Sequence, residues 1–228
     1  MKDSSMPRLK EEAVHIHVDS TVIEGDLVIT EGSEGIVLFA HGSGSSRHSP
    51  RNRFVAQKLQ EGSLSTLLAD LLTREEEEID MKTGRLRFDI DLLADRVVGA
   101  IDWLKRQDQT RELKVGCFGS STGAAAALIA AQKRKEHVEA VVSRGGRPDL
   151  SSAILPEVKA PTLLIVGGND VAVLKMNEDA LSRLRAERKL EIIPGATHLF
   201  KEPGALESVA QAARGWFQRF LSGQEPKG

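Results

Sequence analysis

The stretch Gly119-Ser120-Ser121-Thr122-Gly123 follows an apolar run at 113–118 and precedes an alanine-rich run at 124–131. An apolar run, a turn bounded by glycines and a second apolar run predict a strand, a sharp turn and a helix. Such a turn strains its central residue, requires small neighbours and points the central hydroxyl outward. We therefore predict that Ser121 is a nucleophile; the alternative is a structural turn that is merely rich in serine.

A serine hydroxyl is a weak nucleophile at neutral pH, so it needs a base, and the base needs an orienting carboxylate. In chains with this kind of turn the order is serine, acid, histidine. Two histidines follow the turn: His137 in a polar stretch at the end of the predicted helix, and His198 in a loop after the strand-like run 189–193. Ligand chemistry collects at the carboxyl ends of strands in open α/β sheets. We therefore predict that His198 is the base.

The acid should lie between the serine and the histidine. Asp170 ends the run 161–170, which has the pattern of an apolar strand, a Gly-Gly turn and then a helix start. Asp179 falls inside that predicted helix, and Asp149 suits a helix cap. We predict that Asp170 is the acid, a role that is compatible with capping the helix that follows.

A short apolar strand is also predicted before the glycine- and serine-rich segment 41–46. A His-Gly-x loop after the third strand brings a backbone N–H beside such a nucleophile, and small residues let the backbone approach the substrate. We predict an oxyanion hole made by the N–H groups of Ser43, or of Gly44, and of Thr122. Gly44 is also a candidate substrate contact, and we expect His41 to brace the loop. The segment lacks the lysine of a phosphate-binding P-loop.

Five segments carry a family resemblance: His41-Gly42-Ser43-Gly44, Gly119 to Gly123, Ser143 to Leu150, Gly167-Gly168-Asn169-Asp170 and Gly195-Ala196-Thr197-His198. Together they resemble the dienelactone-hydrolase-like branch of the α/β-hydrolase superfamily, over about residues 13–221. Dienelactone hydrolase proper has a cysteine nucleophile where this chain has Ser121. The resemblance therefore implies the general chemistry but not the substrate, and the serine is more similar to an esterase, lipase-like or peptidase nucleophile.

The alternation of strand-like and helix-like runs predicts an α/β fold, with a doubly wound, mainly parallel α/β-hydrolase sheet and helices on both faces. Runs at 13–18 and 22–29 predict an opening antiparallel pair, with Glu24-Gly25-Asp26 available for a bulge or turn. We expect residues 1–12 to be a flexible tail and residues 13–222 to be a single domain.

The polar stretch 74–87 is too short for a separate cap domain. We expect a solvated loop there, with a mobile lid as the alternative. Without a large insertion, the pocket should be open and formed by loops at the strand ends. Such a pocket favours short acyl chains over long lipids.

The composition is that of a globular protein: 40% of the residues are hydrophobic, 28% are charged and the net charge is −2. This charge gives no support for binding nucleic acid. The single cysteine, Cys117, excludes an intrachain disulfide, suits a reducing compartment and is expected in the core. Residues 1–7 lack the apolar segment of a signal peptide, and no run is long enough to cross a membrane. We therefore expect a cytoplasmic protein.

Two arginines flank a Gly-Gly pair at the end of a predicted strand near the site. Arg144 and Arg147 are candidates for holding a substrate carboxylate; the alternative is a loop salt bridge with Asp149 or another acid.

Three further residues need an interpretation. Asp70 ends the fourth predicted strand and is a candidate brace for the His-Gly-x loop. His15 and His17 share one face of a strand without a third metal ligand nearby, so we expect exposed strand residues and no metal site.

These features predict a serine hydrolase that acts on a small-molecule ester or related acyl substrate. His198 would take the proton of Ser121, Asp170 would stabilise the imidazolium, and water would resolve the acyl-enzyme without a cofactor. The alternatives are a peptidase or thioesterase that uses the same triad, and a non-catalytic fold that binds a ligand or partner.

Overall fold

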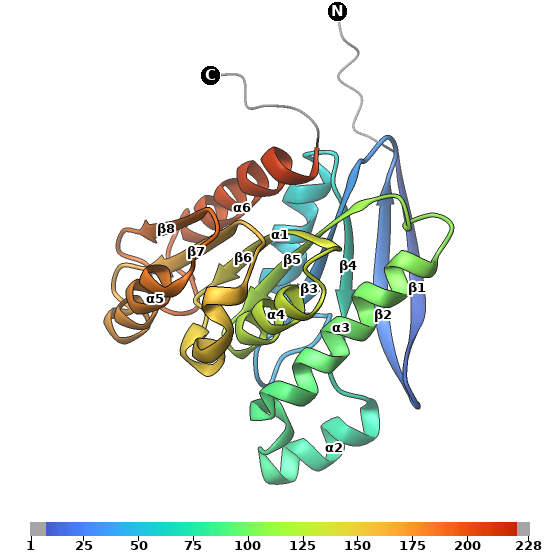
Figure 1. The fold of residues 1–228 in the computed structure, drawn as a ribbon, viewed down its shortest axis with the longest axis horizontal. Helices are drawn as coiled ribbons and strands as arrows, with labels where there is room; N and C mark the ends of the chain where they lie inside the picture. Colours follow the sequence, from blue (N-terminus) through green and yellow to red (C-terminus); the bar gives the residue numbers. More distant parts are fainter. Residues whose placement is uncertain (1–7, 223–228) are drawn as a thin grey trace, which may run out of the picture.

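The computed structural model describes residues 8–222, in which eight strands form one sheet with helices on both faces (Figure 1). The spatial order is β1-β2-β4-β3-β5-β6-β7-β8. The β1–β2 and β2–β4 pairs are antiparallel and the other five pairs are parallel. The predicted doubly wound, mainly parallel sheet is therefore confirmed. The strands are β1 (Leu9–Val18), β2 (Thr21–Thr30), β3 (Gly35–Ala40), β4 (Ser65–Ala69), β5 (Lys114–Ser120), β6 (Val138–Arg144), β7 (Thr162–Gly167) and β8 (Arg188–Ile193).

Two helices cover one face of the sheet and three cover the other (Figure 1). Successive side chains of a strand point to opposite faces, so each central strand supplies both cores. In β5, Cys117 packs in the core beneath α3 and α4, and Phe118 packs in the core beneath α1 and α6. The helices are α1 (Pro50–Gln60) and α6 (Ala205–Leu221) on one face, and α3 (Ile90–Arg106), α4 (Thr122–Lys133) and α5 (Val171–Arg183) on the other; the 3-10 segment η2 (Pro148–Glu157) packs against α4 and α5.

The opening antiparallel pair is longer than predicted. β1 begins at Leu9 rather than near Ala13, because Leu9 pairs with Thr30. The register runs through Gly25 without a bulge, so the bulge or turn predicted there is wrong. Residues 1–7 of the predicted tail lie outside the described residues.

The polar stretch that was predicted to be a solvated loop instead contains α2 (Arg74–Thr83) and the 3-10 turn η1 (Leu86–Phe88). The hydroxyl of Thr73 accepts the N–H of Glu76 at 3.1 Å, and the Glu76 carboxylate accepts the N–H of Thr73 at 2.8 Å. This capping box starts the helix, and Gly84 ends it at φ 64°. Local capping therefore forms a helix that the charge pattern alone did not suggest.

The sheet has a switch point between β3 and β5. The two strands are neighbours, but β3 leads into α1 on one face and β5 leads into α4 on the other. The loops after two such strands part and leave a crevice at their carboxyl ends. The His-Gly-x loop and Ser121 lie at these carboxyl ends. Of the helices between residues 8 and 222, none has the length and apolar character of a membrane span.

Candidate active site

Ser121 sits at a strained turn between β5 and α4, with φ 51° and ψ −122°. The glycines on either side are required by packing. A Cβ on Gly119 would lie 2.4 Å from the Cα of Ala124, and a Cβ on Gly123 would lie 2.3 Å from the carbonyl oxygen of His41. Glycine alone fits at both positions, and a non-glycine residue at positive φ is held there only by its surroundings.

Asp170 and His198 meet at the ends of β7 and β8. Asp170 Oδ2 lies 2.7 Å from His198 Nδ1. Asp170 is the N-cap residue of α5, yet its side chain makes no capping hydrogen bond. Asn169 joins the two loops, because its side chain donates to the Gly195 carbonyl at 2.9 Å and its N–H donates to the Ala196 carbonyl at 2.9 Å. The carboxylate can therefore orient the imidazole and leave Nε2 free.

The end of β6 lies between the serine turn and the histidine loop. The N–H of Ser121 donates to the Arg144 carbonyl at 3.2 Å. At the next residue, a Cβ on Gly145 would lie 3.5 Å from His198 Cε1. The Ser121 hydroxyl makes no hydrogen bond to the residues that the structure describes, so its contact with His198 stays a prediction. Such contacts are often looser in structures without substrate.

The predicted oxyanion loop packs directly against the serine turn. A Cβ on Gly42 would lie 3.0 Å from the Cβ of Ser121. Within residues 8–222, the N–H groups of Ser43 and Thr122 have no acceptor. Gly44 has φ 66°, a conformation that favours glycine. Free backbone donors next to a serine are what an oxyanion hole requires.

His41 braces this loop, as the sequence predicted. The N–H of Leu71 donates to His41 Nε2 at 3.0 Å, and His41 Nδ1 lies 3.0 Å from the Gly42 carbonyl. An amide can only donate, so Nε2 is the acceptor and Nδ1 carries the proton. Burial lowers the pKa of His41, although the Gly42 carbonyl and the Asp70 charge oppose that shift. The imidazole is therefore neutral and links the loop to the end of β4.

Asp70 is the second brace. Its carboxylate accepts the N–H of Arg47 at 2.7 Å and forms an ion pair with the Arg47 guanidinium. Arg47 also contacts Glu24 at 2.6 Å and Asp26 at 3.4 Å. This network holds the far end of the loop against β2 and β4, in the role that the sequence left open for Asp70.

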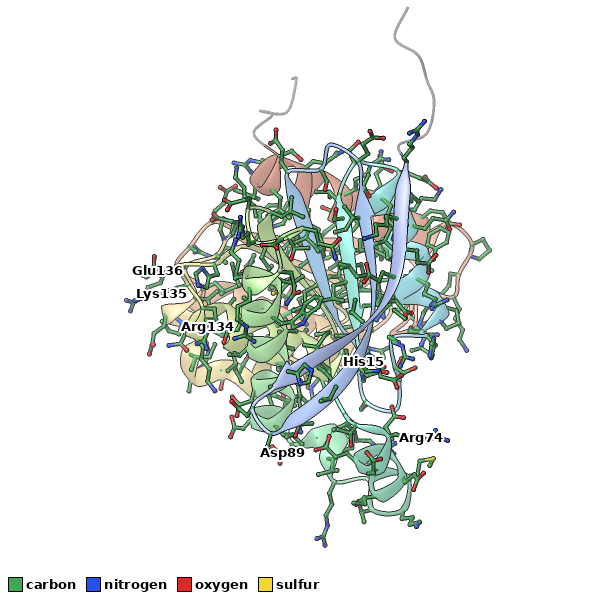
Figure 2. The ribbon with its side chains drawn as sticks, turned by 90° about the vertical axis from the view of Figure 1, so that its right-hand side faces the viewer. His15, Arg74, Asp89, Arg134, Lys135 and Glu136 are labelled. Carbon is green, nitrogen blue, oxygen red and sulfur yellow. The ribbon has the colours of Figure 1, made fainter. Side chains whose placement is uncertain are left out.

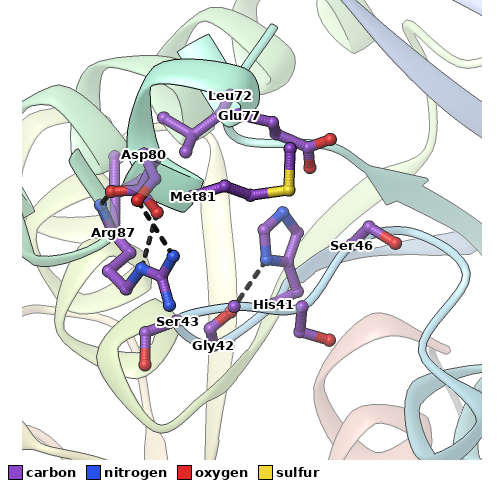
Figure 3. A pocket seen from close by; sticks show the side chains of 12 residues that line it. His41, Gly42, Ser43, Ser46, Leu72, Glu77, Asp80, Met81 and Arg87 are labelled. Carbon is purple, nitrogen blue, oxygen red and sulfur yellow. Dashed lines mark hydrogen bonds and ion pairs between the residues drawn. The ribbon is translucent and has the colours of Figure 1, made fainter. Parts of the chain in front are cut away.

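A cavity of about 260 Å³ lies between the loop 41–46 and helix α2 (Figure 3). Burial by itself would raise the pKa of Asp80, but hydrogen bonds from Arg87 hold it below its ordinary value. The Arg87 guanidinium bonds to Asp80 at 2.6 Å. The helix α2 supplies a wall of this cavity in addition to the strand-end loop, while Ser121, Asp170 and His198 are not among the residues that line it. The wall opposite the loop is lined by Leu72, Glu77, Asp80, Met81, Arg87 and Leu93.

The two arginines near the end of β6 differ. Arg147 forms two hydrogen bonds to Asp149, at 2.8 and 2.7 Å, which is the loop salt bridge that the sequence offered as the alternative. Arg144 is only 8% exposed, and its side chain has no hydrogen bond or ion pair within residues 8–222. Burial, together with the charge of Arg51, lowers the pKa of Arg144 to about 10.

Other candidates fall outside the site. His15 and His17 are exposed on β1, where Figure 2 labels His15. Among the described residues, no three histidine, cysteine or acidic side chains are placed to share a metal ion. Cys117 is fully buried, and burial raises the pKa of its thiol to about 12, so it is a core residue as predicted.

Sequence reasoning missed the α2 residues that line the cavity, and it missed Arg51. The spacing of Thr73 and Glu76 is a capping-box pattern that would have indicated the helix. No local signal marks Arg51, because its effect on Arg144 depends on elements that are far apart in the sequence.

Known proteins are similar to this chain over nearly its whole length. A provisionally named phosphoribosyl transferase from Mycobacterium tuberculosis is 50% identical over 222 residues, which are 97% of this chain and 49% of that protein. This chain therefore spans about half the length of that curated relative. The crystal structure of a dienelactone hydrolase from Anabaena variabilis is 61% identical, covers 95% of this chain and 100% of its own, and superposes with a TM-score of 0.93.

More distant structures share the fold. Est1E from Butyrivibrio proteoclasticus is 16% identical, covers 91% of this chain and 98% of its own, and has a TM-score of 0.77. Residues 23–223 match the family described as the dienelactone hydrolase family. With that match and the α/β-hydrolase sheet described above, the chain belongs to the dienelactone hydrolase family.

Proposed function

We propose that this protein is a serine hydrolase that cleaves short-chain carboxylesters through an acyl-enzyme. The observation that carries the proposal is the 2.7 Å hydrogen bond between Asp170 and His198. It is made by a carboxylate that does not cap its own helix, at the same sheet edge as the strained Ser121. A pair oriented in this way serves an activated nucleophile.

The proposed reaction has two steps. As the Ser121 oxygen attacks the ester carbonyl, His198 Nε2 takes the proton of the Ser121 hydroxyl. The N–H groups of Ser43 and Thr122 stabilise the oxyanion that forms. The imidazolium then gives its proton to the leaving alcohol, and the C–O bond breaks. Water attacks the acyl-enzyme by the reverse proton path and releases the acid, which restores Ser121.

The cavity supports a small acyl or alcohol group. Its volume of about 260 Å³ is below the ~300–1,000 Å³ typical of pockets for drug-sized ligands. Leu72, Met81 and Leu93 give it an apolar side. A short aliphatic chain fits this space better than a long lipid tail.

The name of the Mycobacterium relative describes a protein about twice as long as the part that aligns. We assign hydrolase chemistry to this chain, because its residues 23–223 match the dienelactone hydrolase family.

A fluorophosphonate probe followed by peptide mass spectrometry tests the nucleophile. We expect one labelled residue, Ser121, with labelling lost in Ser121→Ala and kept in the matched control Ser120→Ala. Labelling elsewhere, or none in a folded sample, would contradict the proposal. A panel of p-nitrophenyl esters from acetate to palmitate then tests chain length. Activity confined to thioesters or peptides would favour the alternative hydrolases, and labelling without turnover of any substrate would favour a binding protein.

A further inference from the structure

Arg144 is a buried cation without a counter-ion. It ends β6, and its side chain lies on the same face of the sheet as Val142, which packs in the core beneath α1 and α6. The guanidinium lies over the Phe118 ring at 5.9 Å from the centroid. Its Nη1 is buried without a hydrogen-bond partner, and none of the carboxylates within residues 8–222 forms an ion pair with it. Within residues 8–222 this guanidinium therefore lacks the acceptors that a buried guanidinium normally has.

A second guanidinium without a partner among the described residues belongs to Arg51. Arg51 lies in the first turn of α1, and its Nε is also buried without a partner. Its charge is close enough to disfavour protonation of Arg144. The first turn of α1 contains no acidic residue, although a helix N-terminus favours negative charge. Neither guanidinium has a hydrogen-bond or ion-pair partner within residues 8–222, so none of the described acidic residues balances either charge.

This arrangement is unfavourable for the protein alone. A buried charge without a partner loses hydration without a compensating contact, and two like charges add repulsion. The stacking on Phe118 stabilises the cation in part, but it leaves every N–H donor free. Stability alone would favour an apolar side chain at this position.

We propose that Arg144 and Arg51 form a binding site for an anionic oxygen group of the substrate, a carboxylate or a phosphate. The strand end that carries Arg144 is adjacent to the nucleophile turn, because the Arg144 carbonyl accepts the N–H of Ser121 at 3.2 Å. A planar guanidinium binds either oxyanion through paired N–H···O bonds. The inference rests on the proposed hydrolase function for the role of the anion, but the binding site itself is independent of turnover.

The first experiment measures binding without catalysis. Ser121→Ala protein is titrated by calorimetry with glutarate and, separately, with inorganic phosphate. We expect at least one of them to bind, and the tighter one identifies the anion. Adding Arg144→Met or Arg51→Met should weaken that binding about ten- to hundredfold, the range for a hydrogen bond to a charged group. Arg53→Met is the matched control, because Arg53 lies on the same helix and is already paired with Asp26 at 2.6 Å.

The second experiment places the anion on the substrate. The kcat/KM for mono-p-nitrophenyl glutarate is divided by that for neutral p-nitrophenyl pentanoate. Arg144→Met should lower this ratio about tenfold or more, mainly through KM. Arg144→Lys, which keeps the charge but loses the planar fork, should lower it less. Arg51→Met provides the same test if the Arg144 variants fail to fold.

The outcomes separate this inference from the proposed function. Binding of neither anion, or binding that Arg144→Met and Arg51→Met leave unchanged, would overturn the anion site. Arginine-dependent binding with an unchanged ester ratio would overturn its assignment to the substrate. Arginine-dependent binding in a protein that hydrolyses no ester would support the site and reject the esterase. Hydrolysis of a neutral ester without anion binding would support the esterase and reject the anion site.

Discussion

The arginines near Ser121 fall into two groups that differ in whether they have a carboxylate partner. On the α2 side, each buried or half-buried arginine has a carboxylate: Arg47 has Asp70, Arg87 has Asp80, and Arg96 has Glu76 at 2.7 Å. On the β6 side, Arg147 has Asp149, but Arg144 and Arg51 have no carboxylate among the described residues. Paired charges on the first side hold the oxyanion loop and α2 in place. The unpaired charges on the second side make no such structural contact, which is why we interpret them as facing a ligand.

The largest expected effect concerns the residue between the two sides. Ser121→Ala should lower kcat by a factor of about 10⁶, the scale for loss of a serine nucleophile. His198→Ala should lower kcat by nearly the same factor. Asp170→Asn should cost about 10⁴, because it disturbs the tautomer of the imidazole. Steady-state kinetics on a short ester measures all three. Near-normal activity in His198→Ala with a large loss in His41→Ala would identify a different base and contradict the assignment of His198.

The same substitution at one arginine of each side sharpens the comparison. Arg47→Met leaves the Asp70 carboxylate buried without its cation, so it should lower the free energy of unfolding by about 2–4 kcal/mol and Tm by about 5–10 °C. Arg144→Met removes an unpaired buried cation and should raise Tm by about 2–5 °C. Thermal melts in buffer free of carboxylate and phosphate measure both. A similar decrease for the two variants would mean that Arg144 has a structural role after all.

The pH dependence of stability tests the brace on the paired side. Burial holds the pKa of His41 below its usual value of 6.5, so the folded protein keeps this imidazole neutral while the unfolded chain takes up a proton. Its contribution is complete above pH about 6.5 and is lost as the pH falls through the lower pKa of the folded protein. Urea unfolding between pH 8 and 5 should show this decline, and His41→Gln should reduce it. An equal decline in both proteins would exclude His41 as its source.

The smallest expected effect concerns the mouth of the cavity. Met81 lines it from α2, so Met81→Ala should raise the activity on longer acyl chains relative to acetate by about threefold, since pocket contacts with single methylenes discriminate weakly. Ile79→Ala is the control, because Ile79 is on the same helix and is exposed without lining the cavity. An equal change in this activity ratio in Ile79→Ala would mean that the cavity does not determine the preference for acyl-chain length.

Much of the candidate site could be predicted because its signals are local. A glycine-bounded turn between an apolar strand and a helix marks Ser121, and strand ends mark Asp170 and His198. The same reasoning failed for α2, where four consecutive glutamates, Glu75 to Glu78, suggested a solvated loop. The helix depends on the reciprocal hydrogen bonds of Thr73 and Glu76, which are also local and could have been recognised.

The sequence by itself determined the order of the strands and of the helices other than α2, the turn at Ser121 and the candidate acid and base, because periodicity and glycine placement act over a few residues. Only the tertiary structure decided which charges have partners. Arg144 and Arg147 are three residues apart, yet Arg147 is bound to Asp149 and Arg144 is buried without an ion pair among the described residues. Ion pairing depends on distances of a few ångströms between elements far apart in the chain, and sequence spacing does not encode those distances.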